Sequence, residues 1–238
     1  MRRGRNASKA HMIVSVITPT YNRSRFIPRL IEVYKRQDYN HELMEWLVFD
    51  DGTEPVRDIF RKSCHEHLRY IHSDRRIPMG EKLNFLAKKA TGDIIVVMDD
   101  DDYYPPDRIS RVVAAMTAKP HILLAGSSKI FMYSTEDGKI YCAGPYHTKH
   151  SLNCALAFRP SYLKDHAYDD AEVCAVESVF LNDFTEPMIQ LENQILHIIH
   201  SSNTFKNKMG ISRLLETDLK LEQFIRDPEL REAFKTIQ

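Results

Sequence analysis

An apolar run, Ile94 to Met98, leads directly into four consecutive aspartates, Asp99 to Asp102. Gly92 stands just before the run, and a turn-rich Tyr-Tyr-Pro-Pro segment follows the acids. This pattern predicts a short buried strand that ends in acid. Adjacent carboxylates repel one another and lose hydration at a strand end, so together they favour a shared cation. The cluster therefore indicates a divalent metal site, with a solvated acidic turn as the alternative.

The first half of the chain alternates between apolar runs and amphipathic segments. Besides the run before the aspartates, strands are predicted at 13–18, 46–52 and 68–72, the first of them ending at Pro19. Apolar residues recur at helical spacing in three segments, which predicts helices at 25–37, 79–90 and 106–119. Strands that alternate with helices form a largely parallel sheet with both faces covered, so we expect an α/β fold.

The second half of the chain has shorter strands and longer polar connections. Strands are predicted at 122–133, 139–142, 153–158 and 195–200, with the first two joined as a hairpin at Asp137-Gly138. A helix is predicted to begin at Pro160. Two more helices are predicted from residue 211 onward, at 214–225 and 227–237. No repeat or linker divides the chain, which favours one domain with two functional halves.

Composition narrows the function classes. The sequence has 33 basic and 33 acidic residues, so no overall positive field attracts nucleic acid or an anionic membrane. The four cysteines lack C-x-x-C spacing, which favours reduced thiols in a cytoplasmic protein over a zinc site. No apolar run approaches the roughly 20 residues that span a bilayer, so no transmembrane segment is predicted. The sequence leaves the oligomeric state open.

Three predicted strands end in polar residues, and their carboxyl ends should meet at one crevice of the sheet. Tyr21 offers a flat face to a base, Asp50 or Asp51 can accept the imide N–H of a pyrimidine, and the acid cluster can hold a metal beside a pyrophosphate. These groups favour a nucleoside diphosphate with a metal. An ATPase is excluded, because the chain has no G-x-x-x-x-G-K-[ST] segment.

Four segments, in order, resemble the family 2 glycosyltransferases: SVITPTYNR, LVFDDGT, ATGDIIVVMDDDDYYPPDR and, more weakly, FRPSYL followed by AVESVFLND. The resemblance runs from about residue 14 to residue 200. It implies a GT-A fold, with a mostly parallel mixed central sheet flanked by helices. It also implies an inverting, metal-dependent enzyme of hexosyltransferase type, which moves a sugar from a UDP- or dTDP-type sugar nucleotide to a hydroxyl of a glycan or similar acceptor.

The residue pattern also predicts a domain layout. Residues 1–11 are expected to be a leader or a disordered arm. The glycosyltransferase domain would cover 12–204, with a nucleotide-binding half at 12–108 and an acceptor half at 109–204. Residues 205–238 would form a C-terminal helical extension.

Carried over by position, the resemblance implies a set of nucleotide contacts. These are Thr18, Pro19, Tyr21, Asp50, Asp51, Lys82 and Asn84. Which of the paired aspartates faces the base stays open. The family often has Ala-Arg-Asn where this chain has Lys-Leu-Asn, so a solvated helix face is the alternative for Lys82.

The resemblance also assigns the acid cluster and a late histidine. Asp101 fits both registers in which the family pattern can be aligned, and is assigned to Mn²⁺ or Mg²⁺. Asp99 or Asp100 is assigned to the ribose or to metal-bound water. His200 follows a predicted strand, where GT-A enzymes can send a histidine to the metal or the diphosphate. A structural role is the alternative for this residue.

An acid near the start of a helix in the second half serves as the general base in the inverting family. Glu177 matches that place best, with Asp170 and Glu172 as weaker candidates and a surface acid as the alternative reading. A sugar-nucleotide synthesising enzyme is a distant second, because the glycine-rich loop that it needs is missing. The stronger rival is a non-catalytic module that binds a sugar nucleotide or a glycan.

Overall fold

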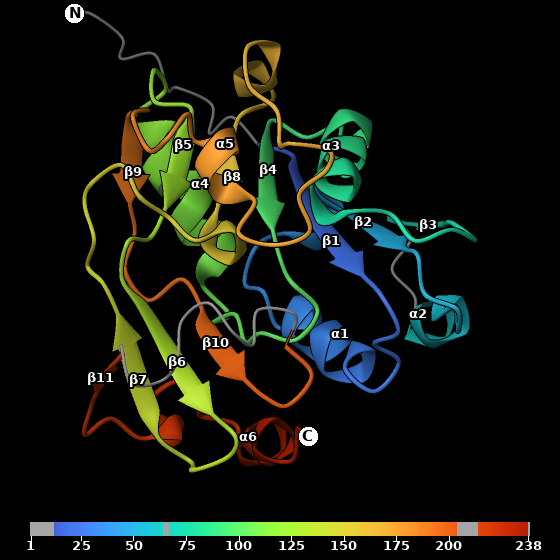
Figure 1. The fold of residues 1–238 in the computed structure, drawn as a ribbon, viewed down its shortest axis with the longest axis vertical. Helices are drawn as coiled ribbons and strands as arrows, with labels where there is room; N and C mark the ends of the chain where they lie inside the picture. The colour runs from blue at the N-terminus through green and yellow to red at the C-terminus, as the bar shows by residue number, and fades with distance from the viewer. Residues whose placement is uncertain (1–11, 64–66, 204–213, 238) are drawn as a thin grey trace, which may run out of the picture.

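The computed structural model describes residues 12–63, 67–203 and 214–237, and its centre is a seven-stranded sheet (Figure 1). The strand order is β3-β2-β1-β4-β8-β5-β9. The strands are β1 (Val14–Thr20), β2 (Met44–Asp50), β3 (Leu68–His72), β4 (Ile94–Val97), β5 (Leu124–Gly126), β8 (Ala157–Phe158) and β9 (Met188–Gln190). The predicted leader and the start of the C-terminal region, 205–213, lie outside the described residues.

The sheet is mixed. β3, β2, β1 and β4 are parallel, whereas β8 runs antiparallel to both β4 and β5. β1 continues through Pro19 to Thr20, so the predicted end at Pro19 is wrong. A proline is tolerated here because the pairing of β1 with β4 stops at Ile17, which leaves β1 paired only with β2 beyond that point.

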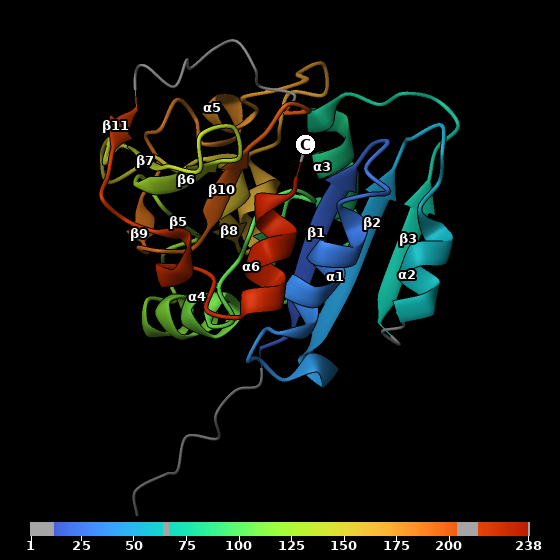
Figure 2. The same ribbon diagram turned by 90° about the horizontal axis from the view of Figure 1, so that it is seen from below.

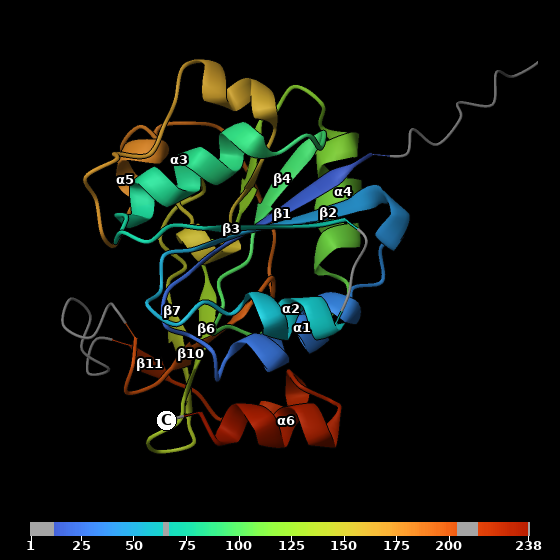
Figure 3. The same ribbon diagram turned by 90° about the vertical axis from the view of Figure 1, so that its right-hand side faces the viewer.

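Helices cover both faces of the sheet, as Figure 3 shows, with α1 and α2 on one face and α3 and α5 on the other. They are α1 (Ile27–Lys35), α2 (Arg57–Ser63), α3 (Met79–Lys89), α4 (Arg108–Ala118) and α5 (Glu177–Phe180). Side chains alternate along β1, so Val14 and Val16 pack into the core beneath α1, while Ile17 packs into the core beneath α3. The predicted α/β class with a mostly parallel mixed sheet is confirmed.

A second sheet of four strands lies beside the first, in the order β10-β6-β7-β11. Its strands are β6 (Ile130–Ser134), β7 (Ile140–Ala143), β10 (Leu196–Ile199) and β11 (Leu215–Glu216). Tyr103, just after the acid cluster, makes backbone hydrogen bonds with Leu196 and thus joins the acid turn to β10. Helix α6 (Pro228–Lys235) packs against α1 (Figure 2), where Arg29 Nη1 donates to the carbonyl of Ala233 at 3.2 Å.

Several predictions for the second half are wrong. The apolar run 122–133 is divided between β5 and β6, which belong to different sheets. Segments 153–155 and 160–164 form 3₁₀ turns, and only 157–158 is a strand. Segment 214–225 contains β11 and a 3₁₀ turn, Leu221–Gln223, in place of the predicted helix. The predicted helix at 227–237 is confirmed by α6. Among the described residues, no helix has the length and apolar character needed to cross a bilayer.

Candidate functional site

A cavity of about 1530 Å³ opens at the carboxyl ends of β1 and β4, between the two sheets. Its walls include eight of the predicted site residues. They are Pro19, Tyr21, Lys82, Asp99, Asp100, Asp101, Glu177 and His200. Residues that are 180 positions apart in sequence therefore meet at the edge where parallel strands end, the usual ligand position in open α/β sheets.

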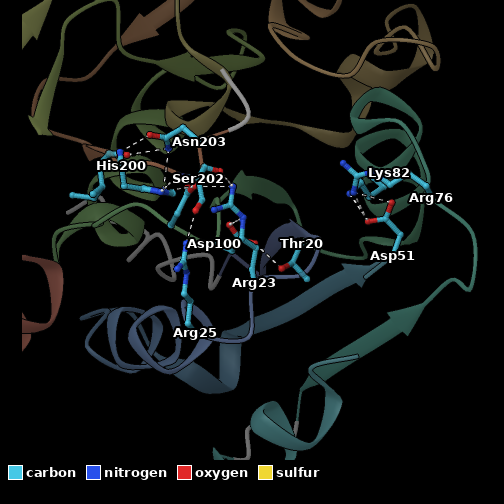
Figure 4. A network of polar contacts seen from close by, with 12 residues as sticks. Thr20, Arg23, Arg25, Asp51, Arg76, Lys82, Asp100, His200, Ser202 and Asn203 are labelled. Carbon is cyan, nitrogen blue, oxygen red and sulfur yellow. Dashed lines mark hydrogen bonds and ion pairs between the residues drawn. The ribbon is translucent and has the colours of Figure 1, made fainter. Parts of the chain in front are cut away.

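The acid cluster is held by β1, the loop that follows it and the turn after β10. Thr20 Oγ1 donates to Asp100 Oδ2 at 2.5 Å, and the Arg23 guanidinium lies 3.9 Å from Asp100 and 3.5 Å from Asp101. His200 Nε2 is 3.1 Å from Asp101 Oδ2. Arg23 also donates to the carbonyl of Ser202, so one cation links three segments, as Figure 4 shows.

The carboxylates of the cluster titrate abnormally. Burial, together with the neighbouring charge of Asp101, raises the pKa of Asp100 to about 7. Burial and the charges of its three acidic neighbours raise the pKa of Asp99 well above its ordinary value. Burial opposes ionisation of Asp101, but the hydrogen bond from His200 and the charge of Arg23 outweigh it and lower the pKa. Ionisation of Asp99 and Asp100 is therefore disfavoured in this setting, and a nearby cation would favour it.

These residues fit a divalent cation. Asp99, Asp100 and Asp101 offer carboxylate oxygens and His200 an imidazole nitrogen, a donor set that suits Mn²⁺ or Mg²⁺. His200 Nδ1 accepts from the backbone N–H of Ser202 at 3.2 Å, which leaves Nε2 facing Asp101. The side chain of His200 is fully buried against Phe26, whose ring centroid is 4.9 Å away. This contact holds the imidazole ring in place, with the Nε2 proton toward Asp101; Nε2 would bind a cation once that proton is lost or moves to Nδ1.

A buried ion pair stands at the other end of the cavity. Lys82 Nζ lies 2.7 Å from Asp51 Oδ1, and the backbone N–H of Ile77 donates to Asp51 Oδ2 at 2.7 Å. Arg76 contacts both oxygens at 3.3 Å and places its guanidinium 3.4 Å from the centre of the Tyr21 ring. Lys82 is 2 % exposed, so the alternative of a solvated helix face is wrong.

Four predicted nucleotide contacts do not line the cavity: Thr18, Asp50, Asp51 and Asn84. The Thr18 hydroxyl is buried between the carbonyl of Met98 and the Trp46 indole. Asp50 accepts from Tyr70 and from two backbone N–H groups. Two partners of Asp51, Lys82 and Arg76, line the cavity, and Arg76 also lies over the Tyr21 ring. Of the paired aspartates, Asp51 is therefore the one connected to the cavity.

The side chain of Asn84 connects α3 to the loop before α5 by hydrogen bonds. Its amide exchanges hydrogen bonds with the backbone of Tyr168 at 2.8 and 2.9 Å and donates to Asp170 at 2.7 Å. Asp170 and Glu172 are exposed and do not line the cavity. The structure thus separates them from Glu177.

Glu177 begins α5 and lines the cavity while half-buried. Burial raises the pKa of its carboxyl. The hydrogen bond from its own backbone N–H lowers that pKa, but only enough to offset part of the rise. A carboxylate with a raised pKa in a cavity suits proton transfer.

Sequence reasoning gave no role to several polar residues of the cavity, among them Arg23, Arg76, His197 and Cys154. Arg23 stands within a quoted motif and Arg76 follows β3, but neither was assigned a role. His197 interrupts an apolar strand, Leu196–Ile199, a pattern that could have marked it. Cys154 gave no signal, because its position depends on a 3₁₀ turn that the sequence pattern did not reveal.

Comparisons with known proteins agree with this geometry. Residues 15–184 match the sequence profile of the family described as Glycosyl transferase family 2. His197 and His200 lie beyond the matched segment. A search of curated proteins found no significant match.

The fold is similar to solved structures. One is the mannosyltransferase PcManGT from Pyrobaculum calidifontis in complex with GDP-Man and Mn²⁺, at 18 % identity and TM-score 0.63, covering 81 % of this chain and 58 % of that chain. Another is S. aureus TarS 1-349 in complex with UDP-GlcNAc, at 18 % identity and TM-score 0.66, covering 94 % of this chain and 66 % of that chain. A third is S. aureus TarS 1-349 in complex with UDP, at 19 % identity and TM-score 0.63, covering 79 % of this chain and 61 % of that chain. The chain thus spans about three fifths of the length of these structures, and the likeness shows a shared fold.

Proposed function

Since the chain belongs to glycosyl transferase family 2 and has the GT-A fold, we propose that it transfers a sugar from a nucleoside-diphosphate sugar to an acceptor hydroxyl. The proposal includes inversion at the anomeric carbon and dependence on Mn²⁺ or Mg²⁺. The supporting observation is that one cavity is lined both by three adjacent carboxylates, Asp99 to Asp101, and by a half-buried glutamate with a raised pKa, Glu177.

The donor would lie along the nucleotide-binding half, residues 12–108. Asp51 lies behind the cavity wall and bonds to Arg76 and Lys82. The side chain of Arg76 is half exposed, and its movement off the Tyr21 ring would let Asp51 accept a base N–H there. Structures with this fold are named as complexes with GDP-Man, UDP and UDP-GlcNAc, which supports a nucleoside-diphosphate donor for this chain. We keep the pyrimidine preference, UDP or dTDP, as part of the proposal.

The acid cluster would hold the diphosphate end of the donor. Asp101 and His200 would bind the cation, and Asp99 or Asp100 would contact the ribose or metal-bound water. When bound, a divalent cation supplies positive charge to the departing diphosphate. Arg23 would add a fixed positive charge at the same edge, 3.9 Å from Asp100 and 3.5 Å from Asp101.

Glu177 would remove the acceptor proton. In a single displacement, the acceptor oxygen attacks the anomeric carbon from the face opposite the diphosphate, and its proton passes to the Glu177 carboxylate. The acceptor half, residues 109–204, supplies this glutamate and the cavity wall around it. The acceptor class, a glycan or similar hydroxyl compound, remains part of the proposal, as does the cytoplasmic location.

A donor screen tests the proposal. A panel of nucleotide sugars would be incubated with the protein, with and without Mn²⁺, and release of nucleoside diphosphate would be measured. We expect Mn²⁺-dependent release from one or a few pyrimidine donors, and none from Asp101→Asn. Binding of a sugar nucleotide without any release, with acceptors present, would favour the non-catalytic module instead.

A further inference from the structure

A second group of potential metal ligands lies next to the acid cluster and has no part in the proposed transfer. Asp102, Cys154 and His197 each place one ligand atom so that all three atoms lie within 4.8 Å of one another. They come from the acid turn, the 3₁₀ turn 153–155 and β10, so the fold itself brings them together. We call these three residues the Asp102 cluster.

One carboxylate oxygen of this cluster has no partner. Asp102 Oδ1 accepts from the backbone N–H of Ile198 at 2.9 Å and lies 2.8 Å from His197 Nδ1. Asp102 Oδ2 has no hydrogen-bond partner among the described residues, although the side chain is fully buried. A buried, unpartnered carboxylate oxygen is costly, so it points to a missing cation or donor.

The cluster is accessible and distinct from the Asp101 site. Cys154 and His197 line the cavity, so an ion can reach them from solvent. Asp101 turns toward His200, whereas Asp102 turns toward β10, and the two adjacent carboxylates therefore have separate partners.

The donor types select the ion. A thiolate, an imidazole and a carboxylate are ligands of Zn²⁺, which takes three protein ligands and leaves a fourth position open at reactive or exchangeable sites. Mn²⁺ and Mg²⁺ prefer oxygen-rich sets without sulfur. We propose that Asp102, Cys154 and His197 form a second metal site, for a thiolate-binding divalent ion of the Zn²⁺ type, with its open position facing the cavity.

The three side chains need to move little in order to bind an ion. Two ligands about 2.0 Å from a tetrahedral ion are roughly 3.3 Å apart, so Asp102 Oδ1 and His197 Nδ1 must separate by a few tenths of an ångström, or Oδ2 must bind instead. The ion replaces the thiol proton of Cys154 and the ring proton between His197 and Asp102, and both protons pass to solvent.

Co²⁺ titration tests this site, because a cobalt–thiolate bond gives an intense near-ultraviolet charge-transfer band that oxygen and nitrogen ligands do not give. The full chain would be titrated with Co²⁺ alone under a phosphine reductant. We expect one thiolate-bound Co²⁺ per chain, displaced by Zn²⁺, which binds such sites more tightly. Cys154→Ser should abolish the band. Cys174→Ser, which removes another cavity thiol, and Cys142→Ser, which removes another buried thiol, should keep it.

His197→Gln gives a second variant if Cys154→Ser fails to fold, which circular dichroism would reveal, and it should weaken the band without removing the thiol. Asp101→Asn should keep the band, which separates this site from the proposed catalytic cation. No band in the wild-type chain, or a band that survives Cys154→Ser, would overturn the proposal. Because the readout is a metal–sulfur bond, its failure leaves the proposed sugar transfer untouched.

Discussion

Asp99 to Asp102 are adjacent in sequence, yet their carboxylates meet different partners. Asp100 bonds to Thr20, Asp101 to His200, and Asp102 to the backbone of β10. Successive side chains after a strand point in different directions, so a run of like residues distributes its charge over several contacts. The position within the run therefore decides the chemistry of each acid.

We predict that Asp101→Asn weakens nucleotide binding in the presence of Mn²⁺ by at least about tenfold, or about 1.4 kcal/mol. The amide keeps the shape of the side chain but removes the charge that would attract the cation. Titration calorimetry with uridine diphosphate and Mn²⁺ measures the effect, and the same titration without metal is the control. Equal affinities of wild type and variant would remove the metal role from Asp101.

We expect Glu177→Gln to reduce transfer by roughly 10²–10⁴-fold, because the amide cannot accept a proton. Donor binding should persist. Since burial raises the pKa of Glu177, the wild-type rate should fall with decreasing pH at a higher pH than for an ordinary glutamate. Steady-state rates across pH check both points. Asp170→Asn is the control, because that exposed residue lies outside the cavity. A collapse at Asp170 with normal activity at Glu177 would reassign the base.

Glu177→Gln also has a predicted effect on the stability of the fold. The folded chain holds the Glu177 proton more tightly than the unfolded chain, so this carboxyl has no effect on stability at low pH. It begins to destabilise the fold as the pH rises through the ordinary glutamate pKa, and does so fully above the raised pKa. Glu177→Gln should therefore melt at a higher temperature than wild type at pH 8, and the difference should shrink toward pH 4.5. Thermal melts at both pH values test this. A variant less stable at pH 8 would contradict it.

At the scale of elements, the Lys82–Asp51 pair joins α3 to the end of β2. Removing one member of a buried pair leaves the other charge uncompensated, at a typical cost of 3–5 kcal/mol. Arg76 and the Ile77 backbone still bond to Asp51, so we expect Lys82→Met to lower the free energy of unfolding by about 3 kcal/mol.

Urea denaturation measures this loss. Lys88→Met, on the exposed side of the same helix, is the matched control and should change stability by less than about 0.5 kcal/mol. If both substitutions have equal effects, the pair does not stabilise the junction of α3 and β2.

The first half of the fold was predictable because its signals are local. β2 and β4 contain apolar runs, WLVF and IIVV, and α4 shows one apolar face. In the second half, 122–133 reads as one strand, but Ser127 and Ser128 bond to side chains of other segments and divert the chain into another sheet. The amphipathic pattern of 214–225 likewise predicted a helix, whereas pairing of β11 with β7 takes precedence there. Tertiary contacts decided both cases.

At the scale of the whole molecule, the cavity depends on both sheets, so a ligand in it should stabilise the entire fold. Uridine or thymidine diphosphate with Mn²⁺, at a hundred times its dissociation constant, adds about 2.7 kcal/mol. For a chain of this size we expect a rise in melting temperature of roughly 5–10 °C. Scanning calorimetry measures it, with adenosine diphosphate and Mn²⁺ as the control. Stabilisation by the purine diphosphate alone would refute the pyrimidine preference.

The candidate site was predictable to the extent that its residues belong to contiguous motifs. Tyr21, Asp99 to Asp101 and Glu177 stand in such motifs and do line the cavity. Thr18 stands in a motif as well, but its hydroxyl bonds within the core. Asn84 stands outside the quoted segments, and its side chain bonds to the backbone of Tyr168. Arg76 and His197 enter the cavity only because distant segments pack together, which no spacing in the sequence expresses.

The two proposed cation ligands are 99 residues apart along the chain. On the ribosome, β1 to β4 and the acid turn emerge long before β10, so the growing chain exposes a strongly acidic edge without the histidine that faces it. With His200 in its proposed role, an unfinished chain has no complete cation site. Partly synthesised copies would then not consume sugar nucleotides, because the proposed site is complete only after β10 and the turn that carries His200 have been made.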